Sequence, residues 1–194
     1  MKIGVLSVQG AVTEHLRHLE QCNVESIAVK NRKTLQQVSG LIIPGGESTT
    51  IGKLISIFGL ADLIRKRSNE GNLAIFGTCA GMILMARDIS DGLPGQPSLN
   101  LMDVQVKRNA FGRQQESFEM ELQFNSLDHP LTAIFIRAPI IEKTGSGVTV
   151  LASLPEGIVA ARQDNLLATS FHPELVEDLR IHQYFIDMCH NLSF

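Results

Sequence analysis

The chain has 194 residues, of which 44% are hydrophobic and 19% are charged, and its formal net charge is −3. This composition is typical of a globular protein with a full core and excludes a disordered chain. A slightly acidic chain with no Trp lacks the basic surface and the stacking side chains that nucleic-acid binding requires, so we expect no nucleic-acid partner.

The sequence also predicts a compartment. No apolar stretch approaches the roughly 20 residues that a membrane helix needs, and the run 1–6 is too short for a signal peptide. The three cysteines, Cys22, Cys79 and Cys189, are odd in number and widely spaced. This spacing predicts neither a disulfide framework nor a metal cluster. We therefore expect a cytoplasmic protein with reduced thiols that contacts no membrane.

The first half of the chain alternates predicted strands with predicted helices. Apolar runs that end at Gly, Pro or Asn indicate buried strands, and apolar residues spaced by three and four indicate amphipathic helices. In chain order these are strand 2–8, helix 12–21, strand 24–29, a short helix capped by Thr34 that ends near Gly40, strand 41–43, helical segments over 49–69, strand 73–76 and a helix over 80–87. This order predicts βαβ units and a parallel sheet.

The second half of the chain has a different character. Residues 91–100 are rich in Gly, Pro, Ser and Asn and predict a loop, whereas 101–169 predict strands linked by turns, with a hairpin between 157–162 and 166–169. A last helix is predicted over 176–190. Because we find no linker or repeat, we expect residues 1–194 to form one domain with a three-layer α/β fold, in which helices flank a mostly parallel central sheet.

The residues 77–81 read Gly-Thr-Cys-Ala-Gly and lie between a predicted strand and a predicted helix. This is the nucleophile-elbow pattern with sulfur in place of the usual serine oxygen. Glycine at 77 and 81 relieves the crowding of so sharp a turn, and the helix N-terminus favours thiolate over thiol. We interpret Cys79 as a nucleophile, with the N–H of Ala80 as one oxyanion donor, rather than as an inert buried thiol.

A histidine follows the last predicted strand, in Ser-Phe-His-Pro-Glu at 170–174. Pro173 ends the strand, which places His172 at the carboxyl edge of the sheet, where open α/β sheets carry their sites. Glu174 could then orient His172 as the third member of a nucleophile–base–acid triad. A polar turn at a strand end is the alternative for this segment. The other five histidines are interpreted as solvated or structurally satisfied, and Cys22 and Cys189 as inert.

These motifs together resemble the class I (triad) glutamine amidotransferases, which release ammonia from the glutamine side chain through a glutamyl thioester. The resulting expectation is the flavodoxin-like fold of that class. Within the class, the chain is similar to the glutaminase subunits of pyridoxal 5′-phosphate synthase. Segments 108–114 and 135–139 carry most of this finer similarity. The supporting segments are 8–11, 44–50, 108–114, 116–119, 135–139 and 170–175.

The resemblance implies further site residues. Gly46 would supply the second oxyanion N–H, while Glu47 and Ser48 would help hold glutamine, although Ser48 or Thr49 could equally be a helix N-cap. The glutamine pocket would be completed by Arg108, Ile136 and Arg137. An arginine suits the α-carboxylate, but the sequence does not say which one, and either could be a plain surface charge. The loop Gln9-Gly10 would contact a partner or adjust the oxyanion hole.

The resemblance also implies the partner. It predicts L-glutamine as substrate, no metal or cofactor, and delivery of ammonia to a barrel-type synthase subunit that makes pyridoxal 5′-phosphate. Three alternatives stay open at this point. They are a glutaminase subunit of another synthase, such as the one that makes imidazole glycerol phosphate, a different hydrolase or peptidase with a cysteine elbow, and a non-catalytic regulatory module of the same fold.

Overall fold

The computed structural model describes residues 1–111 and 116–192, and a ten-stranded sheet runs through its centre. Parallel strands form one half of this sheet in the order β2-β1-β3-β4-β12. Their bounds are β1 Lys2–Leu6, β2 Glu25–Val29, β3 Gly40–Ile43, β4 Ala74–Thr78 and β12 Leu166–Thr169. This is the strand order of flavodoxin-like sheets, and the predicted α/β fold with a parallel central sheet is confirmed.

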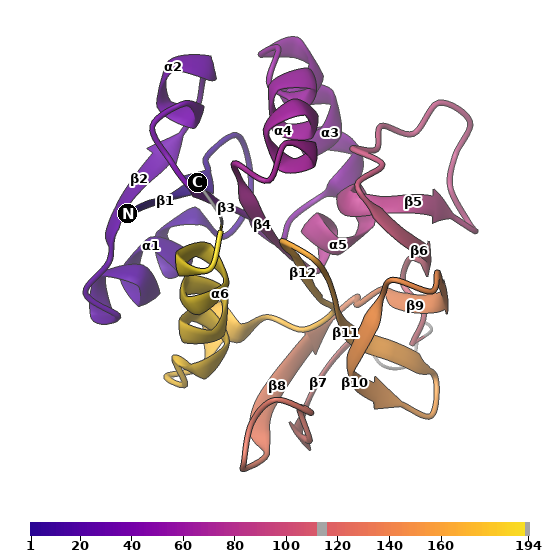
Figure 1. The fold of residues 1–194 in the computed structure, drawn as a ribbon. Coiled ribbons are helices and arrows are strands. Elements are labelled where there is room, and N and C mark those ends of the chain that lie inside the picture. The colour runs from indigo at the N-terminus through magenta and orange to yellow at the C-terminus, as the bar shows by residue number, and fades with distance from the viewer. Residues whose placement is uncertain (112–115, 193–194) are drawn as a thin grey trace.

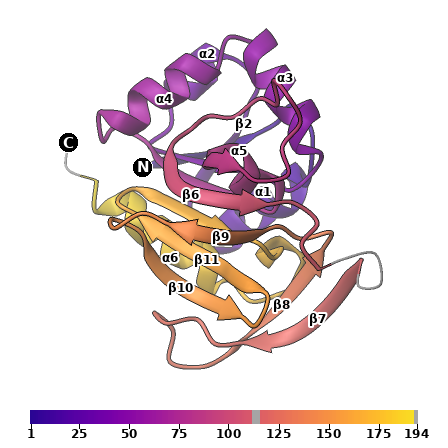
Figure 2. The same cartoon turned by 90° about the vertical axis from the view of Figure 1, so that its right-hand side faces the viewer.

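Helices cover both faces of the parallel half (Figures 1 and 2). Along β3 the side chains alternate between two cores, with Leu41 and Ile43 in one and Ile42 in the other. This alternation is the period of an extended strand buried on both faces. The first core lies under α2 Arg32–Leu35, α3 Ser48–Ile57, α4 Ala61–Asn69 and α5 Ala80–Met85, and the second under α1 Val12–Gln21 and α6 Arg180–His190.

The other half of the sheet is mainly antiparallel. The strand β12 pairs with β11 as the predicted hairpin, and the sheet continues through β9, β6 and β5, while β10 pairs with β11. A separate two-stranded ribbon, β7–β8, packs beside it (Figure 2). The bounds are β5 Ala86–Ile89, β6 Met102–Lys107, β7 Ser117–Leu122, β8 Leu131–Ile136, β9 Ile140–Thr144, β10 Thr149–Leu154 and β11 Gly157–Gln163.

Two predicted helix boundaries in the first half of the chain are wrong. The N-cap of α2 is Asn31, whose side chain accepts a hydrogen bond from the Thr34 N–H at 3.0 Å, so that Thr34 lies inside the helix. The helical segments predicted over 49–69 are confirmed as two helices, and the chain turns between them at Gly59, where φ is +63°. The helix that follows Cys79 ends at Met85, since the next residues form β5 and pair with the distant strand β6.

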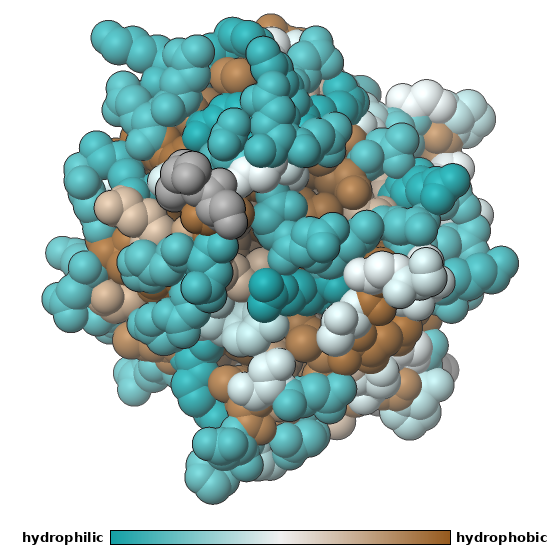
Figure 3. Space-filling model, viewed as in Figure 1, coloured by the Kyte–Doolittle hydropathy of each residue, from teal (hydrophilic) through white to brown (hydrophobic). Residues whose placement is uncertain are grey.

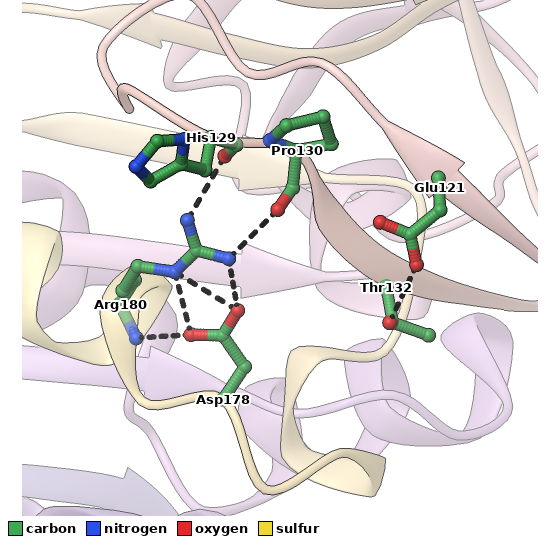
Figure 4. A network of polar contacts seen from close by, with 6 residues as sticks. All are labelled: Glu121, His129, Pro130, Thr132, Asp178 and Arg180. Carbon is green, nitrogen blue, oxygen red and sulfur yellow. Dashed lines mark hydrogen bonds and ion pairs between the residues drawn. The ribbon is translucent and has the colours of Figure 1, made fainter.

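The last helix also begins later than predicted, at Arg180 instead of 176. A 3-10 turn, η1 Pro173–Leu175, and a short loop precede it. Arg180 fixes this loop by binding the carboxylate of Asp178 and donating to the carbonyl oxygens of His129 and Pro130, each at 2.9 Å (Figure 4). The segment that carries the predicted base is therefore tied to the chain that leads into β8.

The surface is consistent with burial of the apolar side chains in the two cores. Hydrophilic residues cover most of the face in Figure 3, and hydrophobic residues form separate patches between them. Within residues 1–111 and 116–192, no helix has the length and apolar character required to cross a membrane.

Candidate active site

Cys79 occupies a strained turn at the carboxyl end of β4. Its backbone has φ 48° and ψ −99°, a conformation that non-glycine residues rarely adopt. The flanking glycines allow this turn. A Cβ on Gly77 would lie 2.5 Å from the carbonyl carbon of Gly81, and one on Gly81 would lie 2.2 Å from the carbonyl oxygen of Ile43. The elbow thus has the steric form that the sequence pattern predicts.

His172 and Glu174 form a buried pair beside the elbow. The distance from His172 Nδ1 to Glu174 Oε1 is 2.7 Å, and the side chains are 10% and 0% exposed. Because a carboxylate can only accept, Nδ1 carries the proton and Nε2 is left for the substrate side. Gly45, at the end of β3, lies against the imidazole ring, since a Cβ there would be 2.5 Å from His172 Cε1.

The environment of His172 favours its charged form. Burial alone would lower the pKa of this imidazole, but the interactions with Cys79 and Glu174, including the hydrogen bond to Glu174, outweigh burial and raise the pKa to about 10. The Sγ atom of Cys79 lies 3.7 Å from the carbonyl oxygen of Ile136. Among the described residues, His172 Nε2 has no hydrogen-bond partner, so this nitrogen is available to a reacting group.

A cavity of about 560 Å³ lies above the elbow. It contains nearly every predicted site residue, which come from the ends of β1, β3, β4, β6, β8 and β12. The predicted residues that line it are Gly10, Gly46, Glu47, Ser48, Cys79, Ala80, Arg108, Ile136, Arg137, His172 and Glu174. Parallel strands end at the same sheet edge, which explains why the residues that follow β1, β3, β4 and β12 meet here.

The loop Gln9-Gly10 packs against the chain segment that carries Gly46. Gln9 Oε1 accepts a hydrogen bond from the Glu47 N–H at 2.9 Å, and the Ala11 N–H donates to Gly45 O at 3.2 Å. Gly10 has φ +111°, and a Cβ there would be 2.1 Å from Gly45 O. The loop after β1 therefore packs against the loop after β3 and holds it in place. Gln9 itself does not line the cavity.

Glu47 has a structural role that differs from the expected one. It is the N-cap of α3, where the sequence left Ser48 or Thr49 as candidates. Its carboxylate accepts from the N–H groups of Thr49 at 3.0 Å and Thr50 at 2.7 Å. Burial works to raise the pKa of this carboxyl, but the hydrogen bonds from Thr50 and Thr49 outweigh it and lower the pKa. Glu47 thus carries a negative charge at the cavity wall.

The side chains of Arg108 and Arg137 differ in how firmly they are held and in how exposed they are. The guanidinium of Arg108 is held by Asp91, because its Nη2 donates to Asp91 O at 2.9 Å and its side chain is only 21% exposed. The side chain of Arg137 is 69% exposed and lies 3.5 Å from a carboxylate oxygen of Glu116. Arg137 also has φ 44°, which kinks the chain directly after β8. Of the motif 108–114, residues 112–114 lie outside the described residues.

Sequence reasoning missed some contributors to this site. Gly45 lies in the segment 44–50, but the sequence assigns it no role of its own, and its role becomes clear only from its contact with the His172 ring. Asn109 and Leu175 also line the cavity, and Asn109 has φ 44°. An Asn in a predicted turn is the signal that could have indicated Asn109, because Asn adopts the left-handed conformation more readily than most residues.

Comparisons with known proteins agree with this geometry. A model described as the SNO glutamine amidotransferase family matches residues 5–191. The pyridoxal 5′-phosphate synthase subunit PdxT of Niallia circulans is 54% identical over 97% of both chains, and that of Pelotomaculum thermopropionicum is 54% identical over 97% of this chain and 95% of its own. The crystal structure of a glutamine amidotransferase superposes with a TM-score of 0.93 at 48% identity, covering 97% of this chain and 98% of the other.

Proposed function

We propose that this chain, which belongs to the SNO glutamine amidotransferase family, hydrolyses L-glutamine to L-glutamate and ammonia as the glutaminase subunit of a pyridoxal 5′-phosphate synthase. The observation that carries the proposal is the convergence of three groups in one cavity. A thiol on a strained elbow, an imidazole with a free Nε2 and a buried carboxylate on Nδ1 have the arrangement of a nucleophile, a base and an orienting acid.

The first half of the reaction forms a thioester. Cys79 Sγ, as the thiolate, attacks the side-chain amide carbon of glutamine, and the N–H groups of Gly46 and Ala80 stabilise the oxyanion. Each such donor is worth about 3–4 kcal/mol in comparable sites. As the C–N bond breaks, His172 gives its Nε2 proton to the departing nitrogen. Ammonia leaves, and a glutamyl thioester remains on Cys79.

The second half of the reaction regenerates the enzyme. His172 Nε2 takes a proton from water, which attacks the thioester carbon, and the same oxyanion donors act again. The C–S bond then breaks and glutamate leaves. Glu174 keeps the proton of Nδ1 in place through both halves, so that Nε2 alone exchanges protons. The high pKa of His172 supports the imidazolium that the first half requires.

The cavity walls have charges that suit the two charged groups on the α-carbon of glutamine. We propose that the carboxylate of Glu47, beside Ser48, attracts the α-ammonium, although its oxygens also cap α3. Arg108 and Arg137 are the cationic groups for the α-carboxylate, and Ile136 supplies the apolar wall between them. The tethering of Arg108 to Asp91 favours Arg108 as the pre-organised partner, because less entropy is lost when it binds.

The partner is proposed to be a barrel-type synthase subunit. Ammonia is mostly ammonium at neutral pH and is then a poor nucleophile, so a glutaminase is useful when it transfers ammonia directly. The names of the relatives support this partner, and the free thiols of Cys22, Cys79 and Cys189 support a cytoplasmic location. The loop Gln9-Gly10 would link partner binding to the oxyanion hole, since it packs on Gly45 and Glu47.

Glutamine hydrolysis by the wild type and by Cys79→Ala, each with and without a pyridoxal 5′-phosphate synthase subunit, tests this function. We expect ammonia release by the wild type with its partner and none by the variant, whereas Cys22→Ala and Cys189→Ala should retain it. A glutamine-analogue alkylator should modify Cys79, as judged by mass spectrometry. Ammonia release that persists in Cys79→Ala, or labelling at Cys22 or Cys189 instead, would refute the assignment.

The role of the loop Gln9-Gly10 has its own test. If the loop couples assembly to activity, the synthase subunit should raise glutamine turnover, and Gly10→Pro should abolish that increase, because the ring cannot adopt a positive φ. Equal turnover with and without the synthase subunit, or an unaffected Gly10→Pro variant, would contradict the coupling without touching the assignment of the triad.

A further inference from the structure

Three buried histidines lie behind the triad, on the side of Glu174 that faces away from His172. His15 and His18 come from α1 and His182 comes from α6, and they are 0%, 2% and 0% exposed. These helices lie side by side (Figure 1). The sequence predicts only solvated or satisfied histidines at these positions. Their contact with a catalytic carboxylate depends on the packing of two helices that are far apart in the chain.

The three rings form a continuous row that ends at Glu174. His15 Nε2 lies 3.5 Å from Glu174 Oε2, His15 Nδ1 lies 2.9 Å from His182 Nε2, and His182 Nδ1 lies 3.2 Å from His18 Nδ1. We call His15, His182 and His18 the histidine row. Thr78, the residue before the nucleophile, is also close, with its Oγ1 3.4 Å from His15 Nε2.

Proton placement along the row follows from the carboxylate. If His15 donates to Glu174 Oε2, which can only accept, its proton lies on Nε2, and His15 Nδ1 then accepts from His182 Nε2–H. His182 Nδ1 accepts in turn from His18 Nδ1–H. Each neutral imidazole has one donor and one acceptor, and this assignment uses them consistently. A donation to the carboxylate would thus select one tautomer for each ring in the row.

The rings of the row are neutral. Burial lowers the pKa of His15 well below its usual value, and the neighbouring His182, His18 and His172 lower it further. Burial, and then the charge of His18, lower the pKa of His182 to about 3. Burial and Arg17 lower the pKa of His18, against the opposing effect of Glu174.

Glu174 Oε2 needs the donor that His15 provides. Within the described residues no group makes a regular hydrogen bond to this buried oxygen, and His15 Nε2, at 3.5 Å, is the nitrogen placed to donate to it, although the same nitrogen also lies 3.4 Å from Thr78 Oγ1. A buried carboxylate oxygen without a donor is costly. A neutral donor also suits the site better than a cation, because a second positive charge would oppose the imidazolium of His172.

We infer that His15 is a positioning residue for the triad, which holds Glu174 Oε2 so that Oε1 is presented to His172, and that His182 and His18 orient His15 in turn. This inference rests on the proposed function, because it gives the triad carboxylate a second hydrogen-bonding partner. It makes α1, the helix that begins directly after the loop Gln9-Gly10, part of the support of the catalytic base. Among the described residues no His, Cys, Asp and Glu group is arranged to hold a metal ion.

Two substitutions at His15 and two controls test the inference. His15→Leu removes the donor, while His15→Gln keeps an amide N–H that can reach Glu174. Leu19→Ala weakens the same helix in the same core without approaching Glu174, and His129→Leu makes the same chemical change on the surface. In His15→Leu we expect kcat for glutamine to fall about 10–100-fold, as for other groups that orient a catalytic side chain, with KM nearly unchanged. His15→Gln should recover much of that loss.

The pH dependence of Cys79 alkylation separates positioning from mere stability. The rate at which iodoacetamide modifies Cys79, followed by mass spectrometry, reports the thiolate–imidazolium pair and requires neither glutamine nor partner. Without its donor, Glu174 is held less firmly against His172 and stabilises the imidazolium less, so the acid limb of the profile should move to higher pH in His15→Leu. The limbs of Leu19→Ala and His129→Leu should coincide with that of the wild type.

An unmoved acid limb in a folded His15→Leu protein, or an equal movement in Leu19→Ala, would overturn the inference. If His15→Leu does not fold, His182→Leu decides, because it removes the donor to His15 Nδ1 and should move the limb in the same direction. Failure of the proposed function would appear differently, as a wild type that releases no ammonia from glutamine beside its partner. The alkylation profile would still decide the role of His15.

Discussion

Gly45 should be essential because of its contact with the catalytic base, and Gly45→Ala tests this. A Cβ at this position would lie 2.5 Å from His172 Cε1 and 3.0 Å from Nδ1. The imidazole would have to withdraw by about 0.9 Å to restore an ordinary contact of 3.4 Å. A displacement of that size would disturb the 2.7 Å hydrogen bond between His172 and Glu174, because its donor Nδ1 is one of the two crowded ring atoms.

The magnitude follows from the geometry. Misplacement of a catalytic group by about 1 Å costs on the order of 100-fold in rate, which is about 2.7 kcal/mol of transition-state stabilisation. We therefore expect kcat for glutamine hydrolysis by Gly45→Ala, measured with the synthase partner, to fall about 100-fold. Gly147→Ala is the matched control, since the nearest atom to its Cβ would be Gln163 Nε2 at 3.9 Å. A Gly45→Ala protein that keeps kcat within about 2-fold would refute the reasoning.

The other predictions concern stability. Gly81→Ala should lower the free energy of unfolding by about 3 kcal/mol or more, measured in denaturant, because its Cβ would meet the backbone oxygen of Ile43 at 2.2 Å; a loss below about 1 kcal/mol would show that the elbow can relax. Arg180→Ala removes the bonds that fix the loop before α6, and we expect a loss of about 1–2 kcal/mol, with an unchanged thermal midpoint as the contrary result. The unfolding free energy should also depend on pH in opposite directions on the two sides of pH 6.5. The pKa of His172 is raised to about 10, so its contribution is complete below pH 6.5 and is lost as pH rises to 10. The pKa of His182 is lowered to about 3, so stability is lost as pH falls from 6.5 toward 3. Chemical denaturation of His172→Gln should show a flatter alkaline side, and that of His182→Leu a flatter acid side; a slope that persists in its own variant would contradict the pKa assignment.

Much of the fold could be predicted because its signals are local. A few neighbouring residues are enough to predict the conformation of the apolar runs at β1, β3 and β4. The same is true of the turn formed by the glycines around Cys79. The order of strands and helices then determines a parallel sheet. The predicted helix boundary was wrong where a segment pairs with a strand that is distant in sequence. Nothing in residues 86–89 indicates that they pair with 102–106, so the helix after Cys79 was extended too far.

The site divides in the same way. Cys79, His172 and Glu174 lie at strand ends, and a strand end can be recognised in sequence. Glu47 was recognised as a site residue, but its capping role was not, because an acidic cap competes in sequence with the adjacent Ser48 and Thr49. The contact between Gly45 and His172 depends on how close two loops approach, and the histidine row depends on how α1 packs against α6. Neither the approach of the two loops nor the packing of the two helices can be predicted from a local sequence pattern.

The glycines at the site have a shared consequence for how its loops move. Gly10 lies against the carbonyl oxygen of Gly45, so the loops after β1 and β3 are in direct backbone contact, and Gly45 in turn lies against the ring of His172, which follows β12. Tightly packed backbone cannot compress, and a shift of the loop at Gly10 must be taken up by Gly45 and then by the imidazole. His172 is also hydrogen-bonded through Nδ1 to Glu174, which His15 of α1 approaches in turn. The loop after β1 therefore reaches the catalytic base through Gly45, and the helix that follows this loop reaches it through Glu174. Because both routes end at His172, the effects of substitutions at Gly10 and at His15 on kcat should not be additive.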